Sequence, residues 1–420
     1  MLGELLRRSL NALELTRLAW GFLTIRASKR HALLHTTSAL LGWHRMNKSE
    51  EDRPDAAEGS SEERAMEEFA QRPTTMPDIG VDLRGFATED QAKAVGAGVL
   101  STLHALGKIL NLKRLRQVIV AYDYDAALAE LDRGTLLPTK ALTATKDEIA
   151  VGIAMAPKVL RDGETACVMV LNAAHMSVLA QTDNPELAAL RDEMTYTLAH
   201  ECGHVHDLDV QESSFPNVIL RTALPFKDGI LFYIASGCWE EYIACRLSAF
   251  FGTETTLRAY QDTFCVALQS GKERADAAIR QYRMHHDVGR VANEVAEVYK
   301  RVLVYASYLF GHLDGLDASV ADKAPKALQE VASRPCFELF FARLHGELRA
   351  LYATYNQWKS IDIFEPLKRL AYDVLKTGGI DIQDRPGGAG YVDIPFTPET
   401  IPTLVEQAAF LAARQSGNLL

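Results

Sequence analysis

The sequence predicts an α+β fold in which a helix, a small mixed sheet and a long helix are followed by a mainly helical second half. Two observations predict it. Before residue 210, runs rich in β-branched residues alternate with helix signals, whereas beyond Thr253 apolar residues recur every three or four positions. The chain has 420 residues, of which 48% are hydrophobic and 24% charged, so we expect one unit of two lobes with a large core.

We expect the first 76 residues to lie outside this unit. Residues 1–45 form a basic leader with seven Lys or Arg and two acids, although the whole chain has a net charge of −10. The apolar run 18–25 is far shorter than the roughly 20 residues that span a bilayer. A surface helix, a targeting peptide and a mis-annotated start before Met46 stay open. Residues 46–76, acidic and poor in large apolar side chains, are predicted to be a disordered linker.

Five elements are predicted between this linker and residue 180. Thr88 and Gln91 form a capping-box pattern at the start of a helix that runs to about Leu110. A strand, a short helix and two extended runs follow, at residues 115–122, 125–132, 149–156 and 166–171. The turn-forming residues 161–164 separate the two extended runs.

A long amphipathic helix is predicted from residue 184 onward. Asn184 suits the N-cap, Pro185 the first helical position and Glu186 the first turn. Apolar residues then recur at spacings of three or four and predict a buried face: Leu187, Leu190, Met194, Leu198, Cys202 and Val205. Cys202 is therefore expected to be a small buried thiol.

The same helix contains the sequence His-Glu-Cys-Gly-His at residues 200–204, which is an HExxH motif. Residues four apart lie on one face of a helix, so His200 and His204 converge on a point where one metal ion can bind. Glu201 lies beside them, and its carboxylate can reach a metal-bound water without being a ligand, as a zinc hydrolase requires. The motif therefore predicts a Zn²⁺ site with Glu201 as general base.

An open tetrahedral zinc site needs a third protein ligand. Residues 236–246 are interpreted as the start of a second helix, in which Glu241 is followed three residues later by Ala244. This segment resembles the ExxA segment of the gluzincin metallopeptidases, in which a downstream glutamate completes a His, His, Glu site and the small alanine permits close helix packing. The resemblance implies His200, His204 and Glu241 as metal ligands.

Glu240 is the alternative third ligand. Adjacent helical positions point about 100° apart, so only one of Glu240 and Glu241 should face the metal, and the ExxA match favours Glu241. The chain departs from the best-known gluzincins in the separation of the motifs and in having Cys245 where an aspartate is frequent, which affects hydrogen bonding to the ligand histidines. A metzincin site is excluded because Asp207 and Val210 stand where that family needs a glycine and a histidine.

The resemblance also implies that residues 77–252 form a zincin-like catalytic subdomain, because helix, strands and HExxH helix follow the zincin order. In that family the strand at the edge of the cleft pairs with an extended substrate. Residues 253–420 would form a mainly helical subdomain that completes the cleft, with helices near residues 255–268, 272–284, 288–313, 337–358 and 364–375. Gluzincins take an oxyanion donor from this downstream region, and the candidates are Tyr242, Tyr282, His285 and His286.

The predicted function is a zinc-dependent peptidase that hydrolyses peptide or protein substrates. The alternatives are a catalytically inactive zinc-binding scaffold or regulatory protein with a zincin fold, and an interaction protein whose HExxH is incidental. The net charge of −10 argues against nonspecific nucleic-acid binding, and a membrane location is not expected. Six cysteines without a paired spacing predict reduced thiols and a cytoplasmic location.

Overall fold

The computed structural model describes residues 68–137, 141–145, 151–385 and 390–416. The predicted leader, residues 1–45, and the predicted linker up to residue 67 lie outside the described residues. The end of the linker belongs to the fold, because Met76 is buried and the Thr75 hydroxyl donates to the Leu110 carbonyl at 2.7 Å. The predicted linker boundary at residue 76 is therefore too late.

A small mixed sheet is the centre of the N-terminal lobe. Its parallel strands lie in the order β1 (Val81–Arg84), β2 (Leu115–Ala121) and β5 (Glu164–Asn172). The two remaining strands, β3 (Ala154–Met155) and β4 (Lys158–Arg161), pair antiparallel with β5 in one continuous register. Together they form a single edge strand. The predicted turn at residues 161–164 is confirmed, because it connects β4 to β5.

Two short strands were not predicted. β1 and β4 have four residues each, too few to show an alternating apolar pattern. Of the extended run predicted at residues 149–156, residues 149 and 150 lie outside the described residues, and Ala154–Met155 forms β3.

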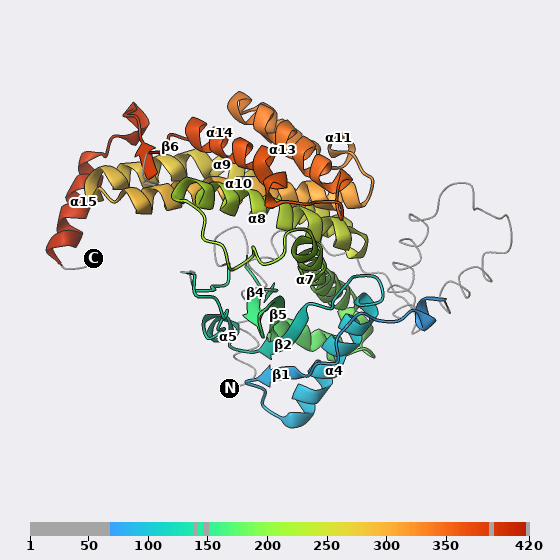
Figure 1. The fold of residues 1–420 in the computed structure, drawn as a ribbon. Coiled ribbons are helices and arrows are strands. Elements are labelled where there is room, and N and C mark those ends of the chain that lie inside the picture. The colour runs from blue at the N-terminus through green and yellow to red at the C-terminus, as the bar shows by residue number, and fades with distance from the viewer. Residues whose placement is uncertain (1–67, 138–140, 146–150, 386–389, 417–420) are drawn as a thin grey trace.

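Helices cover both faces of the sheet (Figure 1). α4 (Glu89–Leu106) packs on one face and α5 (Tyr124–Ala129) on the other. The Thr88 side chain caps α4 by accepting from the Gln91 N–H at 3.2 Å. The Gln91 amide donates to the Tyr122 hydroxyl instead of returning to Thr88, so the predicted capping box is only half formed.

α7 (Ala188–Ser214) carries the HExxH motif and leads from the sheet to the helical lobe (Figure 1). A short 3₁₀ turn, Pro185–Leu187, precedes it, and the Asn184 side chain caps that turn as predicted. The next helix, α8 (Phe226–Ser248), begins ten residues before the predicted start at residue 236. Its first turns contain a glycine and aromatic residues of low helix propensity, and packing on the core stabilises them.

The second lobe is a helical layer built around α10 (Val288–Gly315). The other elements of this lobe after α8 are α9 (Glu254–His285), α11 (Val320–Lys323), α12 (Pro325–Ala332), α13 (Pro335–Ala353), α14 (Glu365–Thr377), the hairpin β6 (Asp381–Asp384) and β7 (Gly390–Asp393), and α15 (Leu404–Gln415). The two helices predicted between residues 255 and 284 are one helix, α9. Because α8 contributes to the core of this layer, the predicted domain boundary at residue 252 is also too late.

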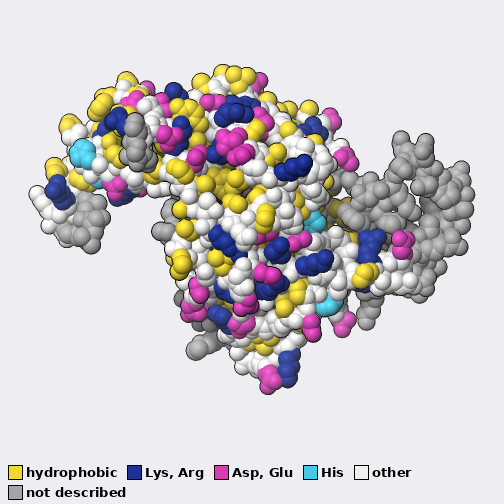
Figure 2. Space-filling model, viewed as in Figure 1, with side chains coloured by type: hydrophobic (Ala, Val, Ile, Leu, Met, Phe, Trp, Pro, Cys, Tyr) yellow, Lys and Arg dark blue, Asp and Glu magenta, His cyan; other side chains and the backbone are white. Residues whose placement is uncertain are grey.

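Among the described residues, no helix is long and apolar enough to cross a membrane. All six cysteines are free thiols, and five of them are buried. On the face seen in Figure 2, Lys and Arg side chains are interspersed with Asp and Glu side chains. This face therefore carries no extended surface of a single charge.

Candidate metal centre

α7 and α8 come close together at Gly203, inside the HExxH motif. A Cβ at Gly203 would lie 2.8 Å from the Cα of Ala244 and 3.3 Å from its Cβ. The backbones can approach this closely because one residue has no side chain and the other a very small one. The contact brings Glu241, which precedes Ala244 by three residues, beside the histidines. The alanine thus permits the close helix packing that the resemblance implies.

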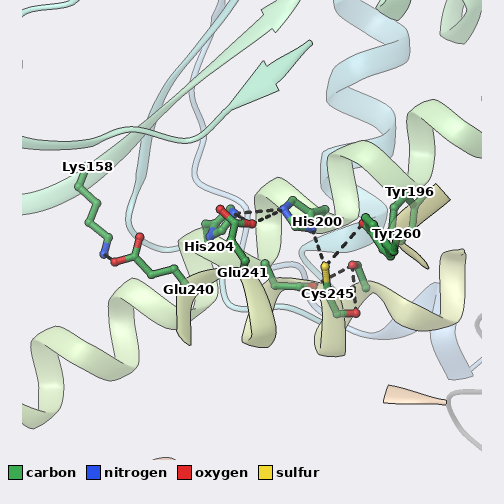
Figure 3. A network of polar contacts seen from close by, with 10 residues as sticks. Lys158, Tyr196, His200, His204, Glu240, Glu241, Cys245 and Tyr260 are labelled. Carbon is green, nitrogen blue, oxygen red and sulfur yellow. Dashed lines mark hydrogen bonds and ion pairs between the residues drawn. The ribbon is translucent and has the colours of Figure 1, made fainter. Parts of the chain in front are cut away.

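Three potential ligand atoms meet at this crossing (Figure 3). His200 Nε2 lies 3.1 Å from Glu241 Oε2 and 3.2 Å from His204 Nε2. His204 Nε2 lies 3.5 Å from the same carboxylate oxygen. The side chains of His200, His204 and Glu241 are 10%, 14% and 22% exposed. The structure therefore brings together the three residues predicted as ligands in a largely enclosed place.

The triangle of ligand atoms fits a zinc ion. Nitrogen and oxygen ligands lie about 2.0–2.1 Å from zinc, so two ligands at a tetrahedral angle are roughly 3.3–3.4 Å apart. The separations of 3.1, 3.2 and 3.5 Å bracket this value. Two imidazoles and a carboxylate are also the donors of catalytic zinc sites that keep one position open.

Glu201 lies beside the two histidines. His200, Glu201 and His204 offer ligand atoms that all lie within 4.8 Å of one another, so this group could hold a metal ion. Burial raises the pKa of the Glu201 carboxyl, and the two histidines and the backbone N–H of Ala156 only partly oppose this rise. A buried carboxylate with a raised pKa next to a metal position is suited to accept a proton near neutral pH.

The charges of the site complement one another. Burial would lower the pKa of His204, but nearby carboxylates, of which Glu241 has the largest influence, outweigh burial and raise it to about 9. Burial would raise the pKa of Glu241, but His204 and His200 outweigh burial and hold it well below its ordinary value. The carboxylates therefore create a negative potential that favours a cation between the imidazoles.

Glu240, the alternative ligand, points to a different partner. Its Oε1 accepts a hydrogen bond from the Lys158 Nζ at 2.7 Å (Figure 3). The lysine comes from β4 and the glutamate from α8, so this ion pair joins the edge strand to the helical lobe beside His204. The side chains are 16% and 30% exposed. Of the two adjacent glutamates, Glu241 is the one that contacts the histidines.

Cys245 is the group that contacts the far side of His200. Its Sγ lies 3.7 Å from His200 Nδ1, and its S–H donates to the Tyr260 hydroxyl at 3.6 Å. The Tyr260 and Tyr196 hydroxyls are hydrogen-bonded to each other, which extends the network shown in Figure 3. If His200 Nε2 is a metal ligand, its Nδ1 carries the proton and donates it to the sulfur. The thiol then orients the His200 ring.

Replacing Cys245 with Ala is expected to weaken zinc binding by about 10-fold, because outer hydrogen-bond partners of metal ligands are worth about 10–100-fold in affinity and a thiol is a weak partner. The measurement is zinc competition with a chelator of known affinity. Cys238→Ala is the matched control, since Cys238 is an equally buried thiol on the same helix that faces Ser307 instead. Equal zinc affinity in the two variants would contradict an orienting role.

His312 lies behind this network and is fully buried against the rings of Tyr196 and Tyr260. Neither of its ring nitrogens has a hydrogen-bond partner among the described residues. Burial lowers the pKa of His312 to about 4, so the native protein holds a neutral imidazole at a pH where the unfolded chain is protonated.

Stability should therefore fall as the pH drops from the unfolded pKa of about 6.5 towards 4, by up to about 3 kcal/mol from this one residue. The measurement is the free energy of urea unfolding between pH 7 and 4.5 for the wild type and His312→Gln. The variant should show a shallower decline with acid, whatever its stability at pH 7. Parallel curves would refute the assignment.

Tyr308 is a residue of the site that the sequence analysis missed. It lies on α10, and its ring stacks on that of His200 with centroids 5.5 Å apart and planes 6° from parallel. Burial raises the pKa of its hydroxyl well above the ordinary value, and the neighbouring Glu241 carboxylate adds to this rise. No motif surrounds Tyr308, so only the packing of α10 against α8 identifies it.

The four oxyanion candidates named from the sequence do not reach the site. Tyr242 is buried and donates its hydroxyl to Asp314 at 2.7 Å. Tyr260 contacts Cys245 near the start of α9, whereas Tyr282 lies 22 residues later on that helix, which is about 33 Å at a rise of 1.5 Å per residue. His285 and His286 pack around Tyr282. No motif supported any of the four candidates, and their packing in the structure is the ordinary role of such residues.

Comparisons of the chain with models of protein families, with curated proteins and with solved structures found no match.

Proposed function

We propose that this protein is a zinc-dependent peptidase of the gluzincin type. The observation that carries the proposal is the convergence of His200, His204 and Glu241 at zinc-ligand separations, with Glu201 beside the two histidines. If the HExxH motif had no metal-binding role, nothing would require a glutamate from another helix to lie at zinc-ligand distances from its two histidines. The proposed ion is Zn²⁺, held by two imidazole nitrogens and one carboxylate oxygen.

In the proposed reaction, the bound metal activates the substrate and the water, and Glu201 transfers the proton. A bound zinc ion supplies Lewis-acid chemistry, which polarises the scissile carbonyl and makes a water more acidic. Glu201 accepts the proton of the attacking water, whose oxygen forms a bond with the carbonyl carbon. The amide bond then breaks, and Glu201 returns the proton to the leaving amine.

The sheet edge next to Glu201 supports a peptide as substrate. Asn172 N donates to Ile153 O at 2.9 Å and Val168 N donates to Pro157 O at 3.1 Å. Since successive backbone groups of a strand alternate in direction, the N–H and C=O groups of Ala154 and the C=O group of Ala156 point away from β5, and the Ala156 N–H on that side faces Glu201. An extended peptide can pair with this edge and present its amide bond to Glu201.

Tyr308 is the proposed donor to the oxyanion, because its ring covers His200 and its hydroxyl lies near Glu241. Tyr308→Phe is expected to lower kcat by about 10²-fold or more, as loss of an oxyanion donor does, while zinc content is unchanged. The measurement is kcat and bound zinc for the same preparation. An unchanged kcat would remove Tyr308 from the proposed mechanism.

The proposed function is tested by metal analysis and a peptide-cleavage screen on one preparation. The full chain should contain about one zinc per molecule, cleave some members of a mixed peptide library, lose cleavage with a chelator and regain it with zinc. His204→Ala should contain no stoichiometric zinc. Zinc without cleavage of any peptide would favour the inactive scaffold, and absence of zinc would refute both readings.

A further inference from the structure

A lysine from α10 lies over α8 one helical turn before the predicted ligand Glu241. The residue at that turn is Gly237. A Cβ at Gly237 would lie 2.7 Å from the Cε of Lys300 and 3.5 Å from its Nζ. The missing side chain therefore leaves the space that the lysine stem fills.

The ammonium group of Lys300 is held in place by the side chain of Tyr233. Its Nζ lies 3.5 Å from the centroid of the Tyr233 ring, which is a cation–π contact. The Tyr233 hydroxyl donates to Glu297 at 2.9 Å, so the ring is fixed as well. Lys300 is half-buried and makes no salt bridge with a described residue. The acid in this group of contacts is Glu297, which accepts from the hydroxyl of the same tyrosine.

Lys300 lies on the side of the helix pair that carries the metal centre. Gly237 precedes Glu241 by four residues on α8, so the two lie on one face of that helix, and the Lys300 side chain lies over Gly237. One helical turn is about 5.4 Å along the axis. Tyr233 is 45% exposed, so this stretch beyond the metal centre is open to solvent.

We propose that Lys300 binds a carboxylate of the substrate one or two residues from the scissile bond, so that the enzyme prefers acidic peptides. The inference rests on the proposed peptidase function. An extended peptide rises about 3.3 Å per residue, so its second residue reaches about the distance of one turn of α8. The carboxylate is an Asp or Glu side chain or a free C-terminus, since both offer the same acceptor to the ammonium.

The probes are short peptide hydroxamates, which chelate zinc and therefore bind without being cleaved. Two matched pairs are compared on the zinc-loaded full chain. In the first pair the residue two positions from the hydroxamate is Asp or Asn. In the second pair the peptide ends in a free carboxylate or in its amide. We expect an acidic probe to bind roughly 10-fold more tightly than its neutral partner, as a charge-assisted hydrogen bond allows. The pair that shows the preference identifies which carboxylate is bound.

Lys300→Met should remove this preference while the neutral probes bind as before, because methionine keeps the stem over Gly237 and loses the charge. Lys227→Met is the matched control, since Lys227 is another half-buried lysine over a tyrosine ring, that of Tyr372. It should keep the preference. Equal binding of acidic and neutral probes, or a preference that survives in Lys300→Met, would overturn the proposal. Failure of every hydroxamate to bind would refute the metal centre itself.

Discussion

Replacing Glu201 with Gln is expected to reduce peptide hydrolysis by about 10²–10⁴-fold, which is the contribution of a general base, and to leave close to one zinc per chain. The Glu201 carboxylate lies beside the two histidines, and the proposed mechanism takes Glu241 as the third ligand. Glutamine fills the same space and cannot accept the proton. The measurement is kcat/KM together with zinc content by elemental analysis.

Glu193→Gln is the matched control for this experiment, because Glu193 is an exposed glutamate on the same helix, two turns before Glu201. It should retain both zinc and hydrolysis. If Glu201→Gln loses zinc to the same extent as His200→Ala, then Glu201 is a ligand and the proposed division of roles is wrong. If it retains full hydrolysis, another group is the base.

The elements that the sequence predicted best are those with a strong local signal. α7 contains its own periodicity and motif, and the 3₁₀ turn before it begins at Pro185 as the pattern predicts. Of its predicted buried face, the residues from Met194 to Val205 are buried, whereas Leu190 is exposed because the first turns of α7 lie at the surface.

Helical geometry predicted that only one of Glu240 and Glu241 would face the histidines, because two adjacent helical residues point in different directions, and the ExxA resemblance favoured Glu241. In the structure Glu241 contacts His200, and Glu240 pairs with Lys158.

The features that the sequence did not predict depend on contacts between distant segments. Tyr308 is separated from His200 by more than a hundred residues, and nothing near it in the chain indicates that its ring covers the histidine. The early start of α8 and its place in the helical lobe likewise follow from packing on α10 and not from propensity. Cys245 looked like the loss of an orienting group, yet its sulfur contacts His200 Nδ1 at 3.7 Å.

Glu241→Gln and Glu240→Gln should affect different properties, zinc affinity and stability respectively, although the two residues are neighbours. Glu241→Gln removes a charged ligand, so its zinc affinity should fall by more than the roughly 100-fold that an outer hydrogen-bonding group contributes. Glu240→Gln should keep its zinc affinity within a few-fold. It leaves the largely buried Lys158 ammonium without its counter-charge, so the free energy of unfolding should fall by about 1–3 kcal/mol.

The two effects are separated by measuring zinc affinity by chelator competition and unfolding by urea, each on both variants. The unfolding experiment is done with excess chelator, so that loss of zinc does not lower the stability of one variant only. A second replacement, Lys158→Met, should restore much of the stability lost in Glu240→Gln, because no buried charge is then left unpaired. Zinc loss in Glu240→Gln with retention in Glu241→Gln would exchange the roles of the two residues and refute the ligand set proposed here.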